Sequence, residues 1–101
     1  IGSSKIAMRA MDRDLREGAD VLLVKPCLFY GDIIRNFANA SNVPIAAYVV
    51  SGEYKMLKDY GEATGCMDNV LKESHIGLLR AGVSVLITYF TPKLLDLIPS
   101  W

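Results

Sequence analysis

The sequence Val21-Leu22-Leu23-Val24-Lys25-Pro26 decides how this chain folds. A near-continuous run of branched apolar residues is typical of a strand that is buried on both faces of a parallel sheet. Pro26 ends the run, because proline has no backbone N–H to donate to a neighbouring strand. We therefore predict a strand over residues 20–25, with Lys25 at its carboxyl end.

Two further apolar runs predict parallel strands over residues 44–50 and 83–89. Helical patterns alternate with these strands, which is typical of an α/β fold with a parallel sheet. Three parallel strands cannot close a barrel, so the chain is either a small three-layer domain or part of a larger barrel. The predicted helices cover 5–16, a segment from Asp32, a segment from Ser51 to a break between Gly61 and Gly65, a segment from a cap at Asp68 or Asn69 to Gly82, and 93–98.

The composition excludes several classes of function. Of the 101 residues 51% are apolar, and 11 basic residues balance 11 acidic ones. A neutral chain is poorly suited to bind nucleic acid or an acidic membrane surface, because both require a basic excess. No apolar run approaches the roughly 20 residues of a membrane span. The chain begins with Ile1 instead of methionine, and we expect it to be part of a longer protein.

The cysteines and the histidine predict no metal site in this chain. Cys27 and Cys66 lie far apart and match no zinc-binding spacing. We expect them to be free thiols in a reducing compartment such as the cytoplasm. His75 has no second histidine at a metal-binding spacing, so we expect it to be a helix-surface or packing residue.

Three polar side chains follow the predicted strands: Lys25, Ser51 and Tyr89. Parallel strands end at the same edge of a sheet, and this edge carries the chemistry in α/β folds. A neutral lysine amine in an apolar setting forms Schiff bases with carbonyl compounds. Ser51 lies where a helix N-terminus favours an anion, and Tyr89 is able to donate to the same anion. Together they indicate a site for a small anionic carbonyl compound.

Each of these residues also has a simpler interpretation. Lys25 is equally consistent with a surface lysine whose stem covers apolar groups. Ser51 is consistent with a helix cap, and Tyr89 with a packed aromatic side chain. Glu53, just inside a predicted helix, is better explained as a first-turn partner of the helix dipole than as a catalytic base.

Four blocks of this sequence carry a specific pattern: Glu17-Gly18-Ala19-Asp20, Val24-Lys25-Pro26, Val50-Ser51-Gly52-Glu53 and Ile87-Thr88-Tyr89-Phe90-Thr91-Pro92. With these blocks the chain resembles the C-terminal part of porphobilinogen synthase, also called δ-aminolevulinic acid dehydratase. The resemblance runs in register over nearly the whole chain.

The resemblance implies a (β/α)8 barrel, of which residues 1–101 form the last three β/α units. It implies an enzyme of haem synthesis that condenses two molecules of 5-aminolevulinate into porphobilinogen. Lys25 matches one of two Schiff-base lysines, and Ser51 and Tyr89 match residues that hold a substrate carboxylate. The family forms homo-octamers, and many members use zinc or magnesium.

The same resemblance leaves parts of the enzyme outside this chain. The other Schiff-base lysine and the zinc-binding cysteines belong to earlier segments of the family sequence, so we expect no metal ligands here. Arg13 resembles the members that lack an allosteric magnesium, which others bind through a carboxylate. Cys27 replaces a glycine that usually follows Lys-Pro. Because the second lysine and the metal-binding cysteines belong to other segments, we expect the isolated chain to be inactive.

Two other functions stay open on the sequence alone. A class I aldolase would also place a Schiff-base lysine at a strand end, but its usual substrates are phosphorylated sugars and no convincing phosphate loop is present. A truncated, non-catalytic isoform with a binding or assembly role is the second alternative.

Overall fold

The computed structural model describes residues 2–101, which contain one three-stranded parallel sheet. Its strands are β1 (Leu22–Val24), β2 (Ile45–Val49) and β3 (Val85–Thr88), with β2 in the centre. In the register, Leu23 lies beside Ala46, and Ala46 lies beside Val85. The alternation of strands and helices confirms the predicted α/β class.

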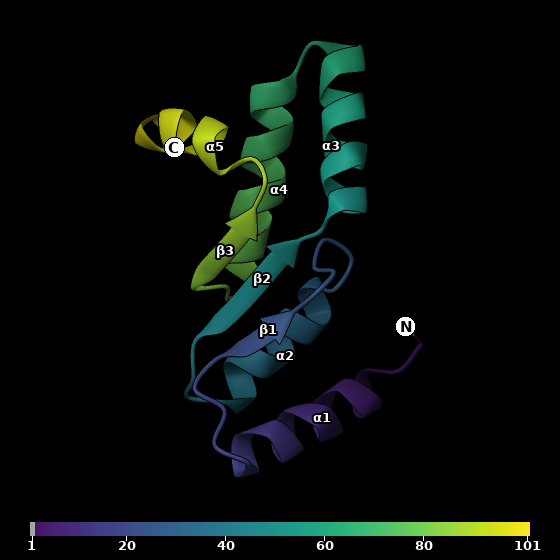
Figure 1. Ribbon diagram of the computed structural model, residues 1–101, viewed down its shortest axis with the longest axis vertical. Helices are drawn as coiled ribbons and strands as arrows, with labels where there is room; N and C mark the ends of the chain where they lie inside the picture. Colours follow the sequence, from purple (N-terminus) through teal and green to yellow (C-terminus); the bar gives the residue numbers. More distant parts are fainter. Residues whose placement is uncertain (1) are drawn as a thin grey trace.

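Helices cover one face of this sheet and extend past its carboxyl edge. In Figure 1, α2 and α4 lie behind the strands, α1 lies beyond the β1 side, and α3 projects past the strand ends. The helices are α1 (Ser4–Arg16), α2 (Gly31–Ala40), α3 (Ser51–Thr64), α4 (Met67–Ala81) and α5 (Thr91–Leu97), followed by a 3-10 turn at Ile98–Ser100.

The helix-covered face of the sheet forms the main core. Alternate residues of the strands point into it, as the two-residue period of a strand requires. The central strand is buried most completely, because it has a neighbour on each side. The core includes Met11, Leu22, Val24, Cys27, Ile34, Phe37, Ile45, Ala47, Val49, Leu78 and Val83.

The opposite face of the sheet is apolar but exposed. Leu23, Val85 and Ile87 keep 50%, 46% and 40% of their surface accessible. In a (β/α)8 barrel this face would point into the barrel interior, where side chains from other strands fill the space. A hollow of about 680 Å³ also lies between α1 and β1. The chain therefore presents the inner face and a free edge of a barrel segment.

The strands are one or two residues shorter at each end than predicted over 20–25, 44–50 and 83–89. The ladder sets these limits, because a residue counts as strand only where a neighbour is paired with it. β1 pairs only with β2, from Leu22 opposite Ile45 to Val24 opposite Ala47. Lys25 and Tyr89 thus lie directly after their strands.

Two helix limits in the middle of the chain were predicted wrongly. Gly61 does not break α3: it is buried in the helix, where a Cβ would lie 2.7 Å from the sulfur of Met67. This glycine allows α3 and α4 to pack closely. The helix ends at Gly65, whose positive φ of 67° suits glycine. Helix α4 then begins at Met67. Its cap residue is Cys66, instead of the predicted Asp68 or Asn69.

Candidate active site

The three predicted site residues lie at the carboxyl edge of the sheet. Lys25 directly follows β1, and Tyr89 directly follows β3. Ser51 is the first residue of α3, two positions after the end of β2. All three side chains are exposed. The parallel topology thus puts an amine, a hydroxyl and a phenol on one accessible edge.

Tyr48 connects two of these residues. The Lys25 amine nitrogen lies 5.1 Å from the centre of the Tyr48 ring. The phenol oxygens of Tyr48 and Tyr89 are 3.3 Å apart, within hydrogen-bonding distance. Tyr48 is not among the predicted site residues, because it lies inside the apolar run over residues 44–50. The two-residue alternation along β2 was the available signal, since it puts Tyr48 on the exposed face of the sheet.

Tyr89 is packed against aromatic rings and is still accessible. Its ring makes edge contacts with Tyr48, at 6.4 Å between centroids, and with Tyr54, at 5.6 Å. The residue nevertheless keeps 57% of its surface exposed. The interpretation as a packed aromatic side chain is therefore correct in part, and the residue is still accessible to a ligand.

The phenol of Tyr89 stays protonated near neutral pH. Tyr48 raises the pKa of Tyr89 above its ordinary value, first through their hydrogen bond and then through charge repulsion, with a smaller contribution from burial. The positive charge of Lys25 opposes this rise in the pKa. Tyr89 is therefore a hydrogen-bond donor that senses the charge of Lys25.

Ser51 lies at the same edge without a direct link to the other two residues. Within residues 2–101 its hydroxyl forms no hydrogen bond with Lys25 or Tyr89. The cap position of α3 is occupied by Val50, so the interpretation of Ser51 as the helix cap is wrong. Its hydroxyl is exposed at the first turn, where the helix N-terminus favours an anion.

Glu53 is a second residue whose contacts exceed those that its sequence position predicts. It lies in the first turn of α3, as predicted, and its carboxylate accepts a hydrogen bond from the Val50 N–H at 3.0 Å. It is also almost fully buried and accepts hydrogen bonds from the N–H groups of Cys27 and Leu28. These donors belong to the loop after Lys25, and no local sequence pattern signals such a contact.

Cys27 is held in the same loop as an unreactive thiol. Burial raises the pKa of Cys27 to about 12, and the charge of Glu53 and a weak hydrogen bond to it add to the effect. The thiol sulfur lies 3.8 Å from a carboxylate oxygen of Glu53. Since the thiolate is the nucleophilic form, Cys27 is not a candidate nucleophile. Cys27 and Cys66 are both free thiols.

His75 is a buried packing residue, so the helix-surface interpretation is wrong. Its Nδ1 lies 2.9 Å from the Leu71 carbonyl oxygen, which only accepts, so Nδ1 carries the proton. Its Nε2 then accepts from the Thr88 hydroxyl at 3.2 Å. Burial lowers the pKa of His75, which keeps the ring neutral and suits this arrangement.

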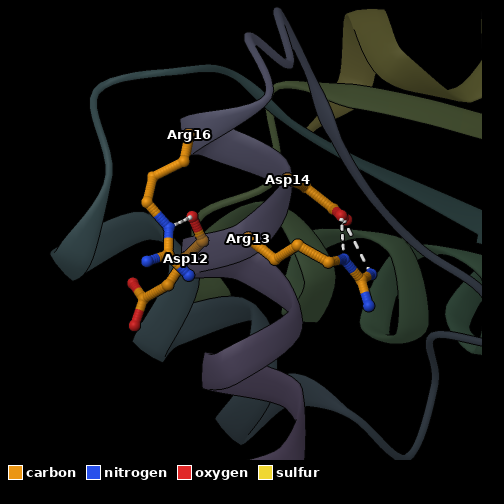
Figure 2. A network of polar contacts seen from close by, with 4 residues as sticks. All are labelled: Asp12, Arg13, Asp14 and Arg16. Atoms are coloured by element: carbon orange, nitrogen blue, oxygen red, sulfur yellow. Dashed lines mark hydrogen bonds and ion pairs between the residues drawn. The ribbon is translucent and has the colours of Figure 1, made fainter.

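The described residues do not suit a metal ion. Residues 2–101 contain no group of three or more His, Cys, Asp or Glu side chains that could hold one. At the position that the resemblance links to an allosteric magnesium, Arg13 contacts Asp14 at 2.9 Å, while Arg16 donates to the Asp12 carbonyl oxygen (Figure 2). The side chains of Arg13 and Asp14 are accessible to solvent on α1. A separate finding concerns membranes: among residues 2–101, no helix combines the length and the apolar composition that a membrane span requires.

The relatives found by comparison with known proteins all carry the same family description. Residues 1–97 match the sequence model of delta-aminolevulinic acid dehydratase. The chain is 49% identical to the delta-aminolevulinic acid dehydratase of Eremothecium gossypii over 98 residues, covering 94% of this chain and 28% of that protein. It is 45% identical to the Macaca fascicularis enzyme, covering 94% of this chain and 29% of that protein. The chain thus spans less than a third of the length of these curated relatives.

A solved structure shows the same arrangement of strands and helices. The crystal structure of delta-aminolevulinic acid dehydratase (porphobilinogen synthase) from Toxoplasma gondii ME49, in complex with the reaction product porphobilinogen, superposes with a TM-score of 0.83. The match is 38% identical and covers 87% of this chain and 25% of that chain. The fold is therefore part of this family's (β/α)8 barrel, as the resemblance implied. By sequence and by structure, the chain belongs to the delta-aminolevulinic acid dehydratase family.

Proposed function

We propose that this chain supplies one Schiff-base lysine and part of the carboxylate site of a porphobilinogen synthase. The complete enzyme condenses two molecules of 5-aminolevulinate into porphobilinogen in haem synthesis. The observation that carries this proposal is the grouping of Lys25, Tyr48 and Tyr89 at the carboxyl edge of a sheet from this family. This edge is where barrel enzymes carry their active sites.

Lys25 is the proposed catalytic residue. Its neutral amine adds to the keto carbon of one 5-aminolevulinate, and the carbonyl oxygen leaves as water with both amine protons, which forms the imine. Ser51 and Tyr89 hold the carboxylate of the same substrate. The protonated phenol of Tyr89 and the exposed hydroxyl at the start of α3 support this role, because both donate hydrogen bonds to an anion.

The isolated chain is proposed to be inactive. Residues 1–101 form the C-terminal part of an incomplete barrel, and the second Schiff-base lysine belongs to another segment. Residues 2–101 contain no cluster of three or more metal-ligating side chains, and the zinc or magnesium that many family members use is proposed to bind to another segment. We place the complete enzyme in the cytoplasm as a homo-octamer, and the two free thiols favour a reducing compartment.

Borohydride trapping tests the proposal. The full-length protein and the isolated chain are incubated with 5-aminolevulinate and borohydride, and the modified lysine is mapped by mass spectrometry. We expect the full-length protein to carry the label on Lys25. Lack of label there would overturn the assignment of Lys25, and porphobilinogen formation by the isolated chain would overturn its proposed inactivity.

The two alternatives give different results in the same experiment. A class I aldolase would be labelled by a phosphorylated sugar in preference to 5-aminolevulinate. A non-catalytic isoform would show no labelling of Lys25 above that of exposed lysines such as Lys55. Family membership and the aromatic setting of Lys25 favour the synthase over both.

A further inference from the structure

Glu53 is a buried carboxylate that is held mainly by backbone N–H groups, with a weak contact from the Cys27 thiol at 3.8 Å. Only 4% of its surface is exposed, and within residues 2–101 it forms no ion pair with a lysine or an arginine. One oxygen accepts from the Val50 N–H at 3.0 Å and the other from the Leu28 N–H at 2.6 Å. The Cys27 N–H lies 3.2 and 3.1 Å from the two oxygens and is shared between them.

These donors come from the two loops that carry the proposed site. Two of the N–H groups lie two and three positions after Lys25, and the third lies directly before Ser51. The Glu53 carboxylate therefore ties the carboxyl end of β1 to the first turn of α3. Without it, three N–H groups in the interior would lose their acceptor, and the two loops would have to move to reach water or other acceptors.

The distance between these loops matters for the proposed chemistry. A keto acid that is bound by its carboxylate at Ser51 and Tyr89 reaches Lys25 only if the amine lies at the right separation. A misplacement of about 1 Å is able to reduce the rate of such a step roughly 100-fold. Glu53 itself is almost fully buried against its N–H partners, so its effect on the reaction would pass through these two loops.

We propose that Glu53 is a positioning residue, whose carboxylate sets the separation between the Lys25 amine and the hydroxyl of Ser51. This inference rests on the proposed function of both residues. A purely structural staple would instead support folding without favouring one ketone over another. The two roles therefore differ in how the reaction depends on the carboxylate of the substrate.

The experiment compares two ketones in the full-length protein. Levulinate has the carboxylate of the substrate, and 2-pentanone has a matching carbon skeleton without it. The rate of borohydride-trapped labelling of Lys25 is measured with each, and the ratio of the two rates is the readout. The variants are Glu53→Gln and Ser51→Ala, with Glu62→Gln as the matched control, since Glu62 is exposed on the same helix.

We expect Glu53→Gln to reduce the ratio of levulinate to 2-pentanone labelling by at least about 10-fold, toward that of Ser51→Ala, while Glu62→Gln leaves it unchanged. If Glu53→Gln loses its helical circular dichroism, Glu53→Asp replaces it, since it keeps the charge but shortens the side chain. An unchanged ratio in the folded variant would overturn the inference and leave the proposed function standing. No labelling of Lys25 by levulinate in the unmodified protein would overturn the proposed function, and this inference with it.

Discussion

At the scale of single residues, the pKa of Tyr89 responds to its hydrogen bond with Tyr48 and to the charge of Lys25. Tyr48 raises the pKa of Tyr89 and Lys25 lowers it, so removing each neighbour has an opposite effect. We expect Tyr48→Phe to lower the pKa of Tyr89 toward its ordinary value near 10, and Lys25→Met to raise it further. NMR titration of protein labelled with 13C at tyrosine Cζ measures both shifts. Tyr60→Phe is the control, because Tyr60 is exposed on α3, and an equal shift in that variant would contradict the assignment.

The glycines of α4 carry a prediction at the scale of the element. Gly82 ends α4 with φ of +126°, and an added Cβ would lie 2.6 Å from the Ala38 Cβ of α2. We expect Gly82→Ala to lower the free energy of unfolding by about 2 kcal/mol or more, from strain and from the clash with α2. Gly77 lies in the interior of the same helix, where an added Cβ would meet only the end of the Arg80 side chain, at 3.8 Å. We expect Gly77→Ala to raise the free energy of unfolding by up to about 1 kcal/mol. Urea denaturation of both variants checks this, and equal effects would show that the end of α4 does not depend on glycine.

At the scale of the whole molecule, we expect the exposed apolar face of the sheet to govern self-association and stability. The Cα radius of gyration is 14.4 Å, above the roughly 13 Å of a compact domain of this length. We expect Leu23→Glu to reduce the self-association of the isolated chain and its binding of a dye that recognises apolar surface, because the glutamate interrupts the apolar face. In a complete barrel the same change should destabilise by roughly 3 kcal/mol or more, since the charge would be buried. Sedimentation and thermal unfolding measure the two effects. Ile6→Glu, at an exposed position of α1, is the control, and a similar loss of association there would argue against the sheet face.

The sequence by itself determined the order of the elements and the approximate position of each strand. Apolar runs and helical periodicity depend on neighbouring residues, so they revealed the three strands, the parallel sheet and the edge that holds Lys25, Ser51 and Tyr89. The same local reasoning failed where a residue serves a distant partner. By residue type Gly61 predicts a break, whereas in the structure it is buried in α3 and packs against Met67.

Only the tertiary structure decided how the site is held together. Glu53 reaches the Cys27 N–H across 26 positions of the chain, and Tyr48 meets Tyr89 across 41. The roles proposed for Lys25, Ser51 and Tyr89 remain predictions, and the structure adds the contacts that join the segments carrying these residues. Local periodicity carries no information about such contacts, because they arise when the sheet brings the ends of separate strands to one edge.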